Sequence, residues 1–271
     1  MNGLEAAIDR FRVHLLTACG LSAVERFDRH LESISLAAFA EAAIFDLLVS
    51  HGLSPVATDD PSTGGVDIQC SLAGVGFAVE VTSLGSDTID SRCLNAQPTG
   101  GFMLNTSEFL ALVRKRVSSK GTNAQARRSV GPRVLAIITD HPFAGAFLRV
   151  AAAELLTGQV GRAWPVGRRG SEGASYPFTE LKNAAHLRWD PNHAVGTFRP
   201  RDALILLAMV DNEKIELLGV ENPNPGYKLP SGALSFVPTT CMVAGVGEAS
   251  LHLAWSLESH EPYCHRFALA K

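Results

Sequence analysis

Acidic residues are missing from one long stretch of this 271-residue chain. No Asp or Glu occurs between Phe109 and Thr139, whereas seven Lys and Arg residues do. The whole chain carries a formal charge of −3, so it is not basic overall, and its positive charge is concentrated in this stretch. One-sided positive charge is typical of a surface that docks a polyanion such as a nucleic acid, although a solvated helix face has the same composition.

Long apolar runs and paired cysteines are also missing. The longest uninterrupted apolar run, Ala203–Val210, is too short to span a bilayer. The five cysteines never occur as C-x-x-C, which favours reduced thiols over a disulfide framework. The N-terminus mixes charges into its apolar residues and has no separate hydrophobic region of a secretory leader. We therefore expect a cytoplasmic protein with no membrane partner.

Several familiar catalytic motifs are absent as well. The chain has no Walker A sequence, no G-x-S-x-G, and no third glycine after either G-V-G. These absences argue against a P-loop NTPase, a nucleophile-elbow hydrolase and a dinucleotide-binding protein. The histidines are not accompanied by C-x-x-C or H-x₃-H pairs, so ordinary surface or packed histidines are a better interpretation than a zinc site.

Hydrophobic periodicity predicts an α/β protein. Residues 4–18 and 22–50 have helical patterns, and an Asn105–Glu108 capping box opens a further helix that reaches about residue 120. Another helix is predicted over residues 144–157. Short apolar or alternating runs predict strands at Leu53–Thr58, Val66–Leu72, Val75–Ser83, Arg133–Thr139, Ala203–Val210 and Lys214–Val220. We expect one domain, 1–271, with a mixed central β-sheet flanked by helices, an insertion at about 160–200 and C-terminal strands at about 203–271.

Two carboxylates fall on the predicted hairpin around Ala73-Gly74. Along the second of its strands, Ala78, Glu80 and Thr82 point to one face and the apolar Phe77, Val79 and Val81 point to the other. Asp67 opens the preceding strand, so pairing through the short turn brings Asp67 and Glu80 close together. Neighbouring carboxylates repel each other unless a cation lies between them, and a hard divalent cation is the usual solution.

This pattern resembles the PD-(D/E)XK nuclease superfamily, which has the restriction-endonuclease-like fold. Asp67 followed by Glu80-Val81-Thr82 is similar to its D…(D/E)-x-K core, and Glu41 matches the acidic first helix of many members. The resemblance covers about residues 36–157. It implies a Mg²⁺ or Mn²⁺ ion held by Asp67, Glu80, the carbonyl of Val81, and Glu41 directly or through water. Glu41 could equally be a flanking surface residue.

Thr82 departs from the motif because it occupies the position of the catalytic lysine. Some members carry this lysine on the following helix, where Lys120 lies on the core-facing stripe of a helical wheel. A buried-side lysine is costly without carboxylate partners, although a lysine whose stem packs and whose head reaches water would fit the same stripe. Arg116 borders the stripe and is the second candidate.

The resemblance implies an endonuclease that hydrolyses phosphodiester bonds, with DNA as the first candidate substrate and RNA as the second. Asp67, Glu80 and Lys120 would be catalytic, and a homodimer or a partner subunit would fit cutting of both strands. The residues expected to contact nucleic acid are Arg114, Lys115, Arg116, Gln125, Arg127 and Arg128. The alternative is a catalytically inactive protein of the same fold that binds nucleic acid or acts as a scaffold or interaction module.

Overall fold

The structure is a computed structural model that describes most of the chain. The described residues are 3–33, 35–58, 66–96, 102–122, 131–142, 145, 148–163, 176–180, 184–188, 196–197, 202–244, 251–257 and 261–268. The helices are α1 (Gly3–Ala18), α2 (Leu21–Ser33), α3 (Ser35–Ser50), α4 (Ser86–Cys93), α5 (Thr106–Thr122) and α7 (Leu148–Thr157).

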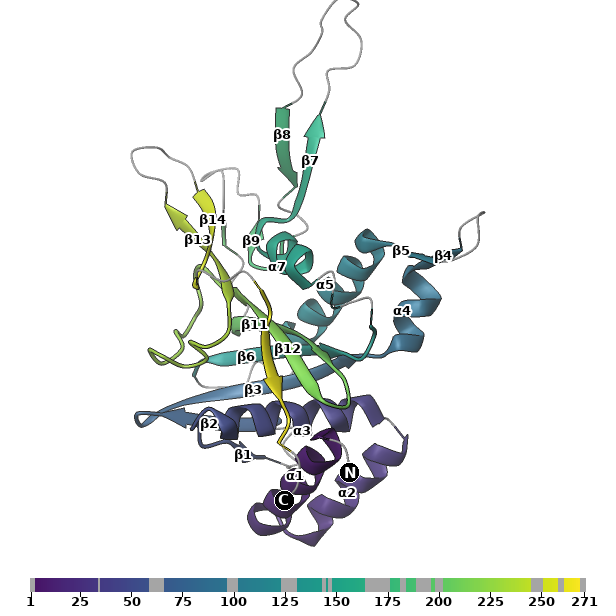
Figure 1. Cartoon of the computed structure of the whole chain (residues 1–271). Helices are drawn as coiled ribbons and strands as arrows, with labels where there is room; N and C mark the ends of the chain where they lie inside the picture. Colours follow the sequence, from purple (N-terminus) through teal and green to yellow (C-terminus); the bar gives the residue numbers. More distant parts are fainter. Residues whose placement is uncertain are drawn as a thin grey trace, which may run out of the picture.

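A mixed sheet of nine described strands forms the centre of the molecule (Figure 1). Its spatial order is β1-β2-β3-β6-β11-β12-β13-β14, and β15 pairs with β12. The strands are β1 (Val56–Ala57), β2 (Ile68–Leu72), β3 (Val75–Leu84), β6 (Arg133–Thr139), β11 (Asp202–Val210), β12 (Lys214–Glu221), β13 (Thr239–Ala244), β14 (Leu251–Trp255) and β15 (Tyr263–Arg266).

The sheet contains both parallel and antiparallel strand pairs. The β1-β2-β3 run is antiparallel, β3, β6 and β11 are parallel to one another, and β11 and β12 form an antiparallel hairpin. The apolar run 203–210 therefore lies in the middle of the sheet, beside β6. Three further pairs of short strands lie off the sheet: β4 (Leu94–Ala96) with β5 (Phe102–Leu104), β7 (Gln159–Ala163) with β8 (Tyr176–Glu180), and β9 (Leu187–Arg188) with β10 (Gly196–Thr197).

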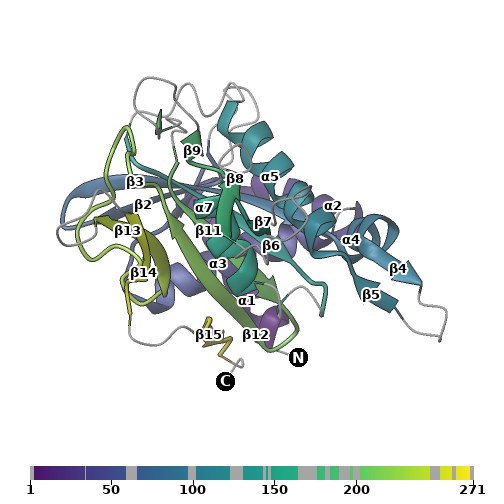
Figure 2. The same ribbon diagram turned by 90° about the horizontal axis from the view of Figure 1, so that it is seen from above.

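Helices cover both faces of the sheet. Helices α1, α2 and α3 pack on one face with Val134, Ala136 and Ile138 of β6, whereas α4, α5 and α7 pack on the other with Leu135 and Ile137. Strand β6 is buried at every position, which explains its unbroken apolar sequence. Figure 1 shows the sheet between the two groups of helices, and Figure 2 shows the same layers from above, where they overlap. The expected α/β class with a mixed, helix-flanked sheet is confirmed.

Two expectations about the elements were wrong. Residues 22–50 form two helices, α2 and α3, and the Ser33 hydroxyl near the break donates to the Arg29 carbonyl. The segment that runs to about Leu104 is rich in Gly, Ser, Asn and Pro, which predicts a loop, but it contains α4. The start of α4 is capped from a distant strand end, because the Asp140 carboxylate accepts hydrogen bonds from the Ser86 amide and hydroxyl at 2.9 and 2.8 Å. A cap that lies 54 residues away leaves no local signal in the sequence.

Candidate functional site

The β2–β3 hairpin brings the two predicted carboxylates together. Its two-residue turn, Ala73-Gly74, has positive φ at both positions (50° and 79°) and sets the pairing of Ile68 with Val79. Asp67 precedes Ile68 by one residue and therefore lies opposite Glu80. The Val81 amide donates a hydrogen bond of 2.6 Å to Asp67 Oδ2, which fixes the Asp67 side chain across the strands. The juxtaposition expected from the hairpin is present in the structure.

Lys120 reaches this pair from α5. Phe109, Val113 and Val117 of α5 are buried against the sheet, and Lys120 follows them on the same stripe. Its Nζ lies 2.7 Å from Glu80 Oε1. The Glu80 side chain is fully buried, whereas that of Lys120 is 27 % exposed. The ammonium group therefore contacts an interior carboxylate, while the Lys120 side chain remains partly exposed to solvent. This agrees with the helical wheel, which placed Lys120 on the core-facing stripe. Arg116, the second candidate, is exposed.

Electrostatics at this position disfavour a second negative charge. Burial, and then the neighbouring Glu80, raise the pKa of Asp67 to about 7, against the opposing effects of the Val81 amide, Lys120 and Arg133. Glu80 Oε2 is buried and has no hydrogen-bond partner among the described residues. Two neighbouring carboxylates, one of them with an oxygen that has no partner among the described residues, form a site that additional positive charge would stabilise.

A second ion pair, missed by the sequence interpretation, completes the group. Arg133 and Asp202, the first residues of β6 and β11, pair directly in the strand register and are both fully buried. Arg133 Nε donates to Asp202 Oδ1 at 2.5 Å, and Arg133 Nη2 donates to the Lys120 carbonyl at 2.9 Å. We call Asp67, Glu80, Lys120, Arg133 and Asp202 the charge cluster. With every group ionised, its three carboxylates and two cations leave one net negative charge.

A usable signal for Arg133 and Asp202 is present in the sequence. Each is a charged residue at the start of an otherwise apolar run, and the two charges are opposite. Fully buried strands that begin with opposite charges can pair those charges when the strands are parallel neighbours. The neighbour relationship of β6 and β11 is the information that the sequence does not contain.

The remaining predicted site residues are placed as follows. Thr82 is buried on the same face as Glu80. The side chain of Val81 is buried, and its amide binds Asp67. Glu41 is partly buried on α3, which packs on the opposite face of the sheet, so its metal-binding role stays a prediction. Gln125, Arg127 and Arg128 lie outside the described residues.

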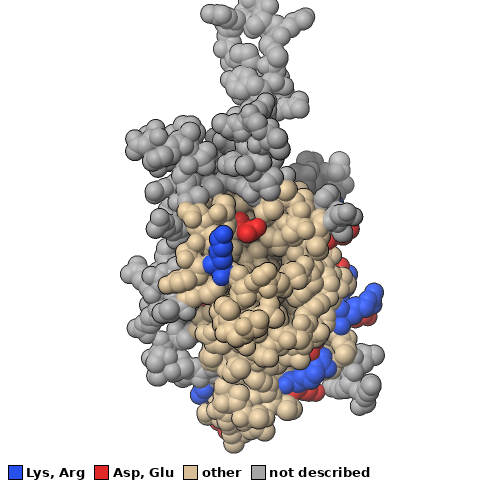
Figure 3. Space-filling view, turned by 90° about the vertical axis from the view of Figure 1, so that its left-hand side faces the viewer, with Lys and Arg blue, Asp and Glu red and all other residues tan. Residues whose placement is uncertain are grey.

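The basic side chains of α5 differ in their surroundings. Lys115 and Arg116 are exposed, whereas Arg114 is partly buried. Arg114 lowers the pKa of Glu154 on α7, although burial of that carboxyl outweighs the effect and raises its pKa overall. Figure 3 shows a different face, in which charged side chains are sparse and blue atoms lie beside red ones. The described residues of that face form no one-sided positive surface.

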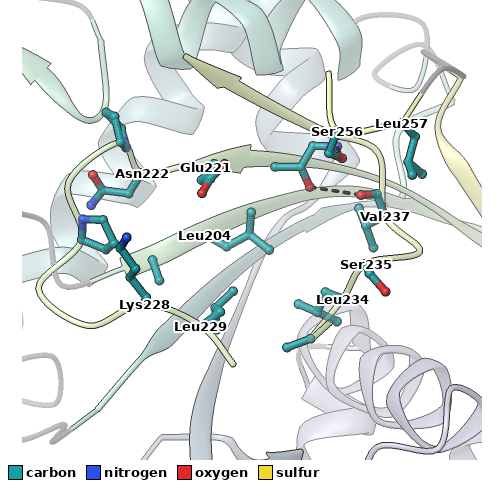
Figure 4. Close-up of a pocket in the computed structure, with 15 residues that line it drawn as sticks. Leu204, Glu221, Asn222, Lys228, Leu229, Leu234, Ser235, Val237, Ser256 and Leu257 are labelled. Atoms are coloured by element: carbon teal, nitrogen blue, oxygen red, sulfur yellow. Dashed lines mark hydrogen bonds between the residues drawn. The ribbon is translucent and has the colours of Figure 1, made fainter. Parts of the chain in front are cut away.

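A separate pocket of about 500 Å³ lies where β11 begins and β12 ends. Figure 4 shows Asn222 and Lys228 on one side of Leu204, and Val237 and Ser256 on the other. Leu204 belongs to the layer of α1–α3, so the pocket is on the opposite face of the sheet from Glu80. The Asn222 amide is already engaged, donating to the Asp202 carbonyl at 2.9 Å and accepting from the Asn224 amide at 3.0 Å.

Neither a ready-made metal cage nor a membrane span is found in the part of the chain that the structure describes. No three His, Cys, Asp or Glu side chains in it gather closely enough to hold a metal ion. None of its helices combines the length and hydrophobicity needed to cross a bilayer. Comparison with known proteins finds no matching family model, no matching curated protein and no matching solved structure.

Proposed function

We propose that this protein is a divalent-metal-dependent nuclease that hydrolyses phosphodiester bonds in DNA rather than RNA. The observation that carries the proposal is the contact of Lys120 Nζ with Glu80 Oε1 at 2.7 Å, beside Asp67 on the neighbouring strand. Two carboxylates and an ammonium group at one position are the groups that such hydrolysis requires. The exposed Lys115 and Arg116 on the same helix would contact the phosphate backbone without reading its sequence.

The proposal includes a restriction-endonuclease-like core. Helix α3 is followed by the antiparallel strands β1, β2 and β3, then by α5 and by β6, which lies parallel to β3. This order supports the PD-(D/E)XK resemblance, with α4 and the β4–β5 hairpin as an insertion. Asp67 directly precedes β2 and Glu80 lies on β3, an arrangement similar to that of the motif, while the lysine comes from α5 in place of Thr82.

The residues present fit a Mg²⁺ or Mn²⁺ ion. Mg²⁺ is commonly held by one or two carboxylates, with water completing the shell, so a site with two carboxylates is sufficient. Asp67 and Glu80 would hold the ion, together with the Val81 carbonyl, and Glu80 Oε2 has no competing hydrogen bond from a described residue. The chemistry that such an ion supplies is polarisation of a phosphoryl oxygen and a lower pKa for a bound water.

The protein's own groups position the reactants. Lys120 uses one N–H on Glu80 and retains two further donors, which can hold a phosphate oxygen or orient the attacking water. The fully buried Glu80 carboxylate lies against this ammonium group, which holds one of its oxygens in place. Asp67 is held by the Val81 amide, so both carboxylates are fixed before substrate arrives.

Cleavage of plasmid, single-stranded DNA and RNA, with Mg²⁺, Mn²⁺ or a chelator, tests the proposal. We expect metal-dependent cutting that is lost in Asp67→Asn and Glu80→Gln. In Lys120→Met, the rate should fall by roughly 10²- to 10³-fold, the cost of removing one preorganised donor to developing charge. Lys228→Met is the matched control, because this exposed lysine lines the pocket on the other face of the sheet. Cutting that persists in Asp67→Asn and Glu80→Gln would refute the proposal.

The inactive alternative is favoured by one observation, Thr82 at the position of the motif lysine. A buried hydroxyl cannot supply the positive charge that a lysine brings to the scissile phosphate. Calorimetric titration with Mg²⁺ and Mn²⁺ separates the two functions. Metal binding that depends on Asp67 supports the nuclease, whereas salt-dependent DNA binding without metal binding or cleavage supports the inactive protein.

A further inference from the structure

The end of α5 is held by a side chain from another element. The last four carbonyls of a helix have no partner within it, and the Lys120 carbonyl, two residues before the last residue of α5, is one of them. Arg133 Nη2 donates to this carbonyl at 2.9 Å. The backbone of Lys120 is therefore attached to the first residue of β6, while its ammonium group contacts Glu80 on β3.

The guanidinium that makes this contact is itself immobilised. Arg133 is fully buried, and its Nε pairs with the fully buried Asp202 at 2.5 Å. The backbone of Asp202 is bound in turn, because the Asn222 side-chain amide donates to its carbonyl at 2.9 Å. The planar guanidinium presents two N–H groups in fixed directions, one to Asp202 and one to Lys120.

Stability alone does not account for a buried pair at this position. Well-packed apolar residues often replace a buried ion pair at no loss of stability. Such residues could not donate to the Lys120 carbonyl. The contact that distinguishes arginine here is therefore the one with the end of α5.

We propose that Arg133 is a positioning residue that holds the end of α5 so that the Lys120 ammonium stays on Glu80. Asp202 fixes the guanidinium in the orientation that reaches the Lys120 carbonyl. The consequence for hydrolysis rests on the proposed function, whereas the placement of Lys120 does not depend on it. A lysine held in this way loses little side-chain freedom when it meets substrate.

Acetylation of lysines with acetic anhydride, read by mass spectrometry on the full metal-free chain, tests the placement. In the wild type we expect Lys120 to react about 10-fold more slowly than the exposed Lys115 of the same helix, which is the internal standard. Glu80→Gln removes the carboxylate that pairs with the Lys120 ammonium group. The acetylation rate of Lys120 in this variant is therefore the reference for a lysine without its ion pair. Arg133→Lys keeps a positive charge for Asp202 but lacks the second fixed N–H, so Lys120 reactivity should rise most of the way to the Glu80→Gln value.

A second variant keeps the test decisive if Arg133→Lys does not fold. Arg133→Met with Asp202→Leu removes both buried charges together and leaves neither unpaired. It should melt cooperatively and still show fast acetylation of Lys120. Lys120 reactivity that stays at the wild-type level in a folded variant would overturn the positioning role.

Cleavage assays report separately on the proposed function. If the wild type cuts DNA, Arg133→Lys should lower kcat by about 10- to 100-fold, the usual effect of losing a group that orients a catalytic residue, with little change in KM. A rise in KM of similar size, with kcat unchanged, would contradict a role of Arg133 in placing Lys120. If the wild type does not cut, the nuclease proposal fails, but the acetylation result still decides whether Arg133 positions Lys120.

Discussion

Asp67 is a partly buried acid beside another acid, so the fold opposes its ionisation. Its pKa is raised from 3.8 to about 7, first by burial and then by Glu80. Between these two values the unfolded chain releases the Asp67 proton and the folded chain keeps it. The free energy of unfolding should therefore fall as the pH rises from about 4 to about 7. Above that range, the cost of ionising Asp67 in the folded protein should stay constant.

Asp67→Asn should remove this penalty. In chelator-treated protein, the free energy of unfolding of the variant should exceed that of the wild type by an amount that grows with pH. The difference should be on the order of 1–3 kcal/mol at pH 8 and absent at pH 4. Urea unfolding at a series of pH values measures the difference. Wild-type and variant curves that run parallel from pH 4 to pH 8 would mean that Asp67 ionises freely, and the need for a cation at the charge cluster would disappear.

His186 is a buried base in the opposite situation. Neither of its ring nitrogens has a hydrogen-bond partner among the described residues, and burial lowers its pKa from 6.5 to about 4. As the pH falls from 6.5 to about 4, the unfolded chain takes up a proton that the folded chain refuses, so stability is lost on acidification. His186→Phe should lack this loss, worth roughly 1–3 kcal/mol by pH 4.5. Thermal melting across this range tests it, and His30→Gln on the exposed face of α2 should keep the wild-type slope.

The β2–β3 hairpin is the element that carries both carboxylates, and its turn has a strict backbone requirement. Gly74 has φ of 79°, a region that residues with a Cβ enter at a cost of about 1–2 kcal/mol. Gly74→Ala should therefore destabilise the protein by about 1 kcal/mol, although an added Cβ would meet no neighbour within 4 Å. Gly76→Ala, two residues further along, is the control, because its Cβ would make only an ordinary contact at 3.8 Å with the Cys70 carbonyl. Equal losses of unfolding free energy in the two variants would contradict the backbone explanation.

Local patterns were sufficient for the elements that carry the predicted catalytic residues. The alternation along 77–82 predicted the two faces of β3, and the wheel over 109–120 placed Lys120 toward the sheet. The Asn105 cap of α5 also forms, because its Oδ1 accepts from the Ser107 and Glu108 amides. Each of these features depends on residues within about ten positions of one another, so the sequence contains the necessary information.

Contacts between distant segments could not be predicted in this way. The pairing of Arg133 with Asp202 requires that β11 lie beside β6, 69 residues apart in the chain. The first turn of α4 is capped by Asp140, which lies 54 residues away, and the sequence around Ser86 does not predict this contact. These contacts follow from the topology of the sheet, which composition and periodicity do not specify.

At the scale of the whole molecule, α1 and the segment around β15 pack together in the same layer. The Leu4 amide donates to the Asn212 carbonyl in the β11–β12 turn, and Arg10 Nη1 donates to the Ala268 carbonyl. Phe267 and Leu4 are buried in one core with α3. Segments from the two ends of the chain therefore stabilise the face of the sheet opposite the charge cluster.

Asp46 on α3 joins these segments and should be critical for stability. Its Oδ1 accepts from Arg10 Nε of α1 at 2.6 Å, and its Oδ2 is 3.2 Å from His265 Nε2 of β15. Burial works against ionisation, but the bonds with His265 and Arg10 outweigh it and lower the pKa of Asp46 below 3.8. A lowered acid pKa contributes stability above its unfolded value, and this contribution is lost as the pH falls through the folded value.

Asp46→Asn should therefore lower the free energy of unfolding by about 1.5–3 kcal/mol at pH 7, the range for hydrogen bonds to a charged group. The deficit should shrink below pH 3.8, where the wild-type carboxyl also gains a proton. Asp28→Asn is the matched control, since Asp28 pairs with Arg12 at 2.8 Å but is 43 % exposed, and it should cost less than about 1 kcal/mol. Urea unfolding at pH 7 and pH 3 measures both variants. Equal losses for Asp28 and Asp46, or a deficit at Asp46 that does not change with pH, would mean that the charged carboxylate is not what holds α1, α3 and β15 together.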